Sequence, residues 1–76
     1  MKRHIYKGYV IDTDQLGRPY IYNTVSPYAE DSDRLYVYVD RKKPYTLIKA
    51  IIDERISTGK DCDRAFIDAA GRIIVE

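Results

Sequence analysis

The stretch that decides the fold is RLYVYVDRKKPYTLIKAIIDERIS, residues 34–57, because its apolar pattern changes along the way. In residues 34–40 (RLYVYVD), aliphatic side chains alternate with tyrosines. Alternation with a period of two is typical of a β-strand whose successive side chains point to opposite faces. We therefore expect a strand with Leu35, Val37 and Val39 on one face and Tyr36 and Tyr38 on the other.

The second half of the stretch has helical spacing. Residues 41–45 (RKKPY) predict a turn, and Thr46 is placed to cap a helix over residues 47–57. Gly59 is expected to end this helix in the left-handed conformation. The helix should lie on the aliphatic face of the sheet through an apolar stripe formed by Ile48, Ile51, Ile52 and Ile56.

Two further strands are predicted upstream. Residues 3–12 alternate and are rich in β-branched and aromatic side chains, which predicts a first strand. Residues 12–18 (DTDQLGR) have turn chemistry, and residues 19–24 (PYIYNT) alternate again, so the two runs predict a hairpin. The polar, acidic residues 26–33 (SPYAEDSD) then predict a loop before the third strand.

The segment after residue 60 allows two interpretations. Cys62, Ala65, Phe66 and Ala69 have helical spacing, whereas residues 67–75 resemble a strand, a glycine turn and a strand. We favour the hairpin, because IDAAGR echoes residues 11–18, which also open with Ile-Asp and close with Gly-Arg. The predicted fold is a single α+β domain over residues 1–76, with a three-strand antiparallel meander, one helix and a C-terminal hairpin or helix-strand segment.

Composition restricts the class of function. The chain has 76 residues and a formal net charge of +1, so no overall field marks a nucleic-acid or membrane-surface binder. Cys62 is the single cysteine, which is typical of a reducing compartment, and no apolar run reaches the length of a signal peptide or membrane span. We expect a cytoplasmic protein with no membrane partner.

Catalytic and metal-binding chemistry is poorly represented. Three Asp-x-Asp pairs are better explained by turns than by a metal site. Asp40-Arg41-Lys42 only superficially resembles the acid-x-lysine signature of metal-dependent nucleases, and His4 and Cys62 have no catalytic setting. We expect no enzyme activity, no metal and no cofactor.

Tyrosine is the unusual feature of the composition, with eight tyrosines and no tryptophan. The predicted strands place Tyr9 inward and gather a tyrosine face on the side away from the helix, formed by Tyr6, Tyr20, Tyr22, Tyr36 and Tyr38. Three interpretations remain open: cross-strand pairs that stabilise a small sheet, a protein-binding face, or a stacking platform for single-stranded nucleic acid.

Charge is distributed in blocks along the chain, which favours a specific partner over a general polyanion. The acidic loop and the basic turn are candidate parts of a binding surface, through Glu30, Asp31 and Asp33 in the loop and Arg41, Lys42 and Lys43 in the turn. Unpaired sheet edges also favour a homodimer.

Several short motifs resemble a known group of proteins. YKGY at residues 6–9, GRPY at residues 17–20 and PYTL at residues 44–47, followed by Ile52-Asp53-Glu54, are similar to small strand-strand-helix proteins of bacteriophages and mobile elements. The resemblance covers residues 5–56 and implies an accessory protein, in some cases an inhibitor of host machinery such as CRISPR-type defence nucleases. It implies no catalytic residue.

Together these observations predict a non-enzymatic binding protein, encoded by a phage or mobile element, that engages and inhibits a bacterial host protein through the tyrosine face. The alternative is a module that binds single-stranded nucleic acid through the same face and the basic turn.

Overall fold

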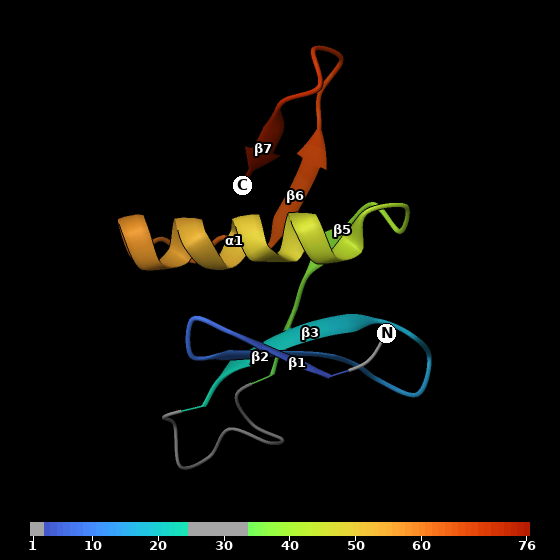
Figure 1. Cartoon of the computed structure of the whole chain (residues 1–76), viewed down its shortest axis with the longest axis vertical. Coiled ribbons are helices and arrows are strands. Elements are labelled where there is room, and N and C mark those ends of the chain that lie inside the picture. The colour runs from blue at the N-terminus through green and yellow to red at the C-terminus, as the bar shows by residue number, and fades with distance from the viewer. Residues whose placement is uncertain (1–2, 25–33) are drawn as a thin grey trace. The chain divides into compact units, whose positions relative to one another are not determined.

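The computed structural model describes residues 3–24 and 34–76, and these residues form an α+β fold, as predicted (Figure 1). The chain divides into two compact units, Met1–Val37 and Tyr38–Glu76, each with its own sheet. The prediction of a single domain stays a prediction. The elements of the first unit are β1 (His4–Tyr6), β2 (Tyr9–Thr13), β3 (Pro19–Asn23) and β4 (Leu35–Tyr36). Those of the second unit are β5 (Tyr38–Val39), α1 (Pro44–Thr58), β6 (Arg64–Ile67) and β7 (Ile73–Val75).

The predicted first strand is a hairpin instead. β1 and β2 pair antiparallel, with His4 opposite Ile11 and Tyr6 opposite Tyr9. The loop between them is Lys7-Gly8, with φ of 49° and 81°. Two-residue hairpin loops favour positive φ at both positions, because the resulting twist matches that of the strands. The alternating pattern across residues 3–12 concealed this turn, so the prediction of one continuous strand was wrong.

The predicted third strand is also divided. β4 pairs with β3 in the first sheet, whereas β5 pairs parallel with β6 in the second. The Val37 N–H donates to the Pro19 carbonyl at 3.1 Å, and the next N–H, of Tyr38, donates to the Asp63 carbonyl at 2.8 Å. The alternation in residues 34–40 fits strand geometry in either sheet, so the sequence pattern did not reveal the change of partner.

Helix α1 begins earlier than predicted and ends as predicted. Lys43 occupies the N-cap position without a side-chain cap, and Pro44 follows in the first turn, where its missing N–H costs nothing. Thr46 therefore lies inside the helix, and its predicted capping role was wrong. Gly59 has φ of 71° and its N–H donates to the Arg55 carbonyl, which confirms the predicted C-terminal stop.

The helix packs against β5, β6 and β7 of its own unit. Three of the four residues predicted for its apolar stripe are buried, and the fourth, Ile56, is 53% exposed in the last turn. The inclusion of Ile56 was wrong. The buried positions are Leu47, Ile48, Ile51 and Ile52.

The C-terminal hairpin is confirmed, since β6 and β7 pair antiparallel with Phe66 opposite Ile74. Its loop repeats the β2–β3 loop: both have the sequence Asp-x-x-Gly-Arg. The Asp14 Oδ1 atom accepts the N–H of Leu16 and of Arg18, and Asp68 Oδ1 likewise accepts two loop N–H groups, at 3.0 and 2.8 Å. The two similar sequence segments therefore form hairpin loops with the same hydrogen bonds.

Candidate functional site

Three tyrosines of the first unit form a packed cluster. Tyr20 and Tyr22 are buried together with Val10, and Tyr36 packs against them. The rings of Tyr20 and Tyr22 are stacked at 6.2 Å, and Tyr36 meets Tyr20 edge-on at 5.8 Å. Tyr20 is only 5% exposed, so it belongs to the core of the unit. Of the three interpretations, this packing corresponds to the structural one, since Tyr20 pairs across strands with Tyr36 and Tyr22 stacks on Tyr20 along β3.

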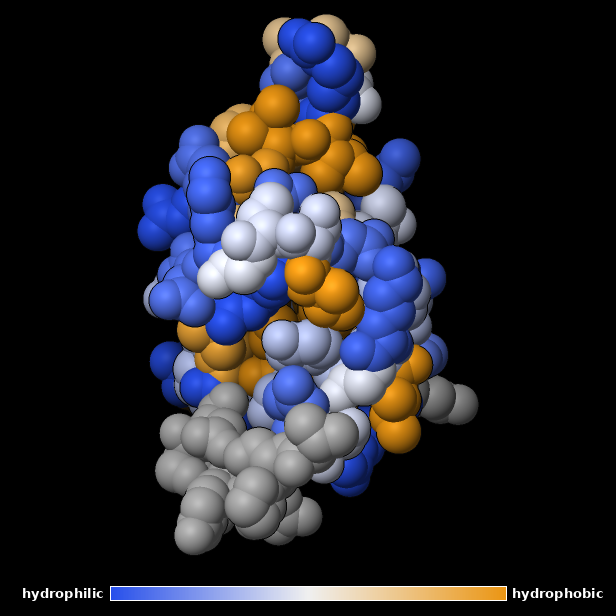
Figure 2. Space-filling model, turned by 90° about the vertical axis from the view of Figure 1, so that its left-hand side faces the viewer, coloured by the Kyte–Doolittle hydropathy of each residue, from blue (hydrophilic) through white to orange (hydrophobic). Residues whose placement is uncertain are grey.

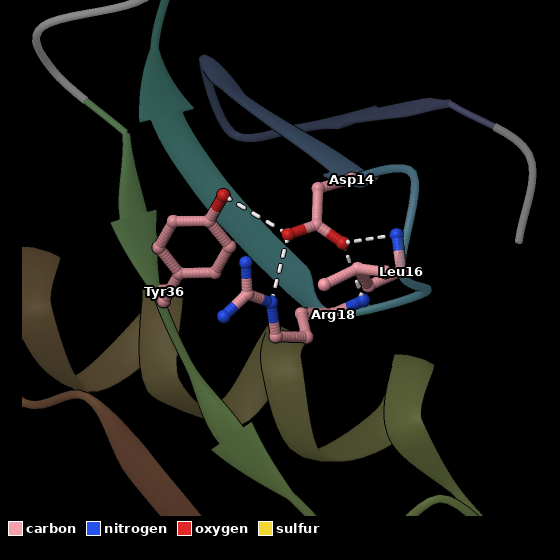
Figure 3. A network of polar contacts seen from close by, with 4 residues as sticks. All are labelled: Asp14, Leu16, Arg18 and Tyr36. Atoms are coloured by element: carbon pink, nitrogen blue, oxygen red, sulfur yellow. Dashed lines mark hydrogen bonds and ion pairs between the residues drawn. The ribbon is translucent and has the colours of Figure 1, made fainter.

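Polar groups hold the edges of this cluster. The Arg34 guanidinium lies 4.4 Å from the centre of the Tyr20 ring, and Arg3 Nη2 donates to the Tyr22 hydroxyl at 2.8 Å. Tyr36 donates through its hydroxyl to Asp14 Oδ2 at 3.2 Å, and Arg18 Nε donates to the same oxygen at 2.9 Å (Figure 3). These bonds tie the β2–β3 loop to β4 and limit the freedom of the tyrosine rings.

The same contacts perturb two ionisable groups. The backbone N–H of Arg18 lowers the pKa of Asp14, with smaller contributions from the Arg18 side chain, the Leu16 N–H and the Tyr36 hydroxyl. Burial, assisted by the negative charge of Asp12, raises the pKa of Tyr20 above its ordinary value of 10.0. Both shifts follow from the structure of the first unit alone.

The raised pKa of Tyr20 gives a prediction for alkaline pH. The unfolded chain releases this proton near pH 10.0, whereas the folded chain retains it. Unfolding therefore becomes more favourable as the pH rises above 10.0, because only the unfolded state gains the charged form. In an absorbance titration of tyrosinate, one group should titrate late in the wild type and be missing from Tyr20→Phe. Unchanged late titration in that variant would contradict the assignment.

The remaining residues of the predicted tyrosine face lie elsewhere. Tyr6 is opposite Tyr9, and through Tyr9 and Asn23 its register places it on the sheet face opposite to Tyr20 and Tyr22. The Lys7-Gly8 loop causes this change of face. Tyr38 belongs to the second unit, on β5. Tyr6 therefore does not share a face with Tyr20 and Tyr22, and this part of the prediction was wrong.

The sheet of the second unit carries an exposed apolar surface that the sequence analysis did not identify. Tyr38 is 61% exposed and lies opposite Arg64, whose guanidinium is 5.6 Å from the Tyr38 ring. Phe66, two residues along β6 on the same face, is 42% exposed. Ala65 between them is buried, so β6 has one packed face and one open face. If residues 64–67 (RAFI) are read as a strand, their alternation places Arg64 and Phe66 on one face and Ala65 on the other, which would have indicated the exposed face.

Two exposed isoleucines lie at the far end of the hairpin on the other face of the sheet, because Ile67 and Ile73 alternate with Phe66 and Ile74 along their strands. Ile67 and Ile73 are opposite each other and both exposed, and Figure 2 shows hydrophobic surface on the hairpin below its polar tip. They line a shallow hollow of about 550 Å³ together with Lys42, Lys43 and Tyr45. We call the exposed apolar side chains of this sheet the hairpin surface; Tyr38 and Phe66 belong to one face of the sheet, and Ile67 and Ile73 belong to the other.

The predicted charged segments have different outcomes. Arg41, Lys42 and Lys43 form an exposed turn before α1, stabilised by Asp40, whose Oδ1 accepts the Lys42 N–H at 2.9 Å. The acidic loop with Glu30, Asp31 and Asp33 lies outside the described residues. Of the charged residues predicted for binding, the structure therefore locates only the basic turn, which borders the hairpin surface.

No group of three or more metal-ligating side chains occurs in the described part of the chain. No helix within residues 3–24 and 34–76 has the length and apolar character needed to cross a membrane. Cys62 is buried, and its carbonyl accepts a hydrogen bond from Arg55 Nη1 at 2.9 Å.

Comparison with known proteins found no matching family model, no matching curated protein and no matching solved structure. The resemblance to phage and mobile-element proteins stays a prediction.

Proposed function

We propose that this chain is a non-enzymatic binding protein that engages a bacterial protein through the hairpin surface. The observation that carries the proposal is the exposure of Tyr38 and Phe66 on one face of the three-stranded sheet, with Ile67 and Ile73 exposed on the other face at the far end of the same hairpin. Exposed apolar side chains that occur singly need no explanation, whereas a group of them is typical of an interaction site. Aromatic residues also supply much of the binding energy in protein interfaces.

The neighbouring charges favour a particular kind of partner. Lys42 and Lys43 border the hollow next to Ile67 and Ile73. A protein surface with apolar side chains flanked by carboxylates would complement this arrangement, because rim charges guide association while the apolar centre supplies affinity. If the partner is host machinery, as the resemblance to phage proteins implies, covering a working surface of that partner would inhibit it.

The proposal predicts that Tyr38→Ala/Phe66→Ala abolishes partner binding while leaving the fold intact. Loss of the two side chains should weaken partner binding at least tenfold, since truncation of an aromatic hot-spot residue costs more than about 1 kcal/mol of binding free energy. The measurement is affinity capture from nuclease-treated bacterial lysate with mass spectrometry, followed by titration of the purified partner. Circular dichroism establishes that the variant is folded.

A matched double variant in the first unit serves as the control. Ile5 and Leu16 are also strongly exposed, so Ile5→Ala/Leu16→Ala removes similar apolar area outside the hairpin surface and should leave capture unchanged. The proposal would be contradicted if both double variants lost partner binding equally, or if neither lost it. Recovery of nucleic acid that disappears at raised salt would instead support the nucleic-acid module.

A further inference from the structure

β7 is the outermost strand of its sheet, since the strand order is β5-β6-β7. Its bonds to β6 include the Arg72 carbonyl, which accepts the Asp68 N–H, and the Glu76 N–H, which donates to the Arg64 carbonyl. In an antiparallel pair, alternate residues bond to the partner strand, so the backbone groups of Ile73 and Val75 point away from β6. These groups present a row of donors and acceptors at the edge of the sheet.

The sequence along this edge complements itself. If a second β7 is laid antiparallel with Ile74 opposite Ile74, then Ile73 faces Val75 and Arg72 faces Glu76. The register is the same from either chain, so the Ile73–Val75 and Arg72–Glu76 contacts each occur twice and the Ile74 pair lies on the two-fold axis. If the register is shifted by two residues in either direction, Arg72 no longer faces Glu76, and the two Ile74 side chains no longer face each other. Charge complementarity therefore selects one register and one occupant.

We propose that two copies of this chain associate through β7 in this register and join their three-stranded sheets into one. This inference concerns the sheet edge and does not depend on the partner proposed above. The Ile73 and Val75 backbone groups of each copy satisfy those of the other. Strand pairing at this edge uses main-chain groups together with the apolar side chains of Ile73, Ile74 and Val75.

The side chains on the open face of the joined sheet also match. Phe66 lies opposite Ile74, so the dimer has an apolar row that runs Phe66, Ile74, Ile74, Phe66 across the two copies. A charged row runs beside it: Asp68 and Arg72 of one copy are followed by Glu76 and Arg64 of the second, with alternating sign. Arg72 Nε already contacts Asp68 Oδ2 at 3.4 Å. A guanidinium has five N–H donors, so Arg72 keeps donors for the carboxylate of Glu76 in the second copy.

The test exchanges charges between two variants. Arg72→Glu alone places two like-charged pairs in the dimer, and so does Glu76→Arg alone, so each variant should associate at least tenfold more weakly than the wild type. Mixed in equal amounts, they form a heterodimer in which every Glu faces an Arg, and association should return to near the wild-type level. Sedimentation equilibrium over a concentration series measures all four samples.

Lys60→Glu is the matched control, since it reverses an exposed charge outside β7 and should leave the dimer unchanged. Thermal unfolding followed by circular dichroism identifies any variant that has lost its fold. A wild type that stays monomeric up to about 1 mM would overturn the proposal. A mixture of folded variants that associates no better than its two components would also overturn it. Recovery on mixing supports it, because a structural defect in either variant is not repaired by mixing.

Discussion

Ile51→Ala is expected to reduce the free energy of unfolding by about 2–5 kcal/mol. Ile51 lies in the middle of α1 and has no exposed surface, so truncation removes buried apolar atoms and leaves a cavity. A chain of 76 residues has a total stability of roughly 4–11 kcal/mol, from about 0.05–0.15 kcal/mol per residue. One substitution should therefore consume a large share of the stability. Urea denaturation followed by circular dichroism measures the loss.

The control is Ile56→Ala on the same helix. Ile56 is exposed in the last turn, and alanine has the higher helix propensity, so the stability should change by less than about 0.5 kcal/mol. The pair differs only in burial. Similar losses at both positions would mean that Ile56 is covered and that the exposure assigned to the end of α1 is wrong.

Much of the fold could be predicted because its signals are local. Gly59 ends the helix as expected, and the two Asp-x-x-Gly-Arg loops form where the glycine and aspartate predicted turns. Local chemistry also explains the errors near Lys7-Gly8. The alternating pattern on both sides of this pair is unbroken, and a two-residue loop leaves no polar segment to reveal it.

The pairing of strands depends on residues far apart in the sequence, and the predicted pairing was wrong for this reason. Leu35 and Tyr36 pair with β3, whereas Tyr38 and Val39 pair with β6, although all four belong to one alternating run. Alternation specifies which side chains share a face and leaves the neighbouring strand open. The predicted tyrosine face assumed that Tyr36 and Tyr38 lie on one strand of one sheet, whereas they pair in two different sheets, and the exposed Phe66 was overlooked for the same reason.

Tyr20→Ala is expected to cost about 3–5 kcal/mol, the range for truncation of a large buried aromatic residue. The ring contacts Tyr22 and Tyr36 and lies below the Arg34 guanidinium, so its loss opens a cavity between β3 and β4 and removes two aromatic pairs. Aromatic pairs contribute about 0.5–1.5 kcal/mol beyond the buried area. Chemical denaturation of the variant should show a midpoint far below that of the wild type.

Tyr38→Ala separates the stabilising tyrosines from those available for binding. Tyr38 is 61% exposed, so its truncation should change stability by less than about 0.5 kcal/mol while weakening partner binding through the hairpin surface. The two tyrosines thus predict opposite phenotypes: an unstable chain for Tyr20→Ala, and a stable chain with impaired binding for Tyr38→Ala. If both variants lost stability equally, Tyr38 would be a packing residue, and the hairpin surface would lose the aromatic residue on which the proposed interface depends.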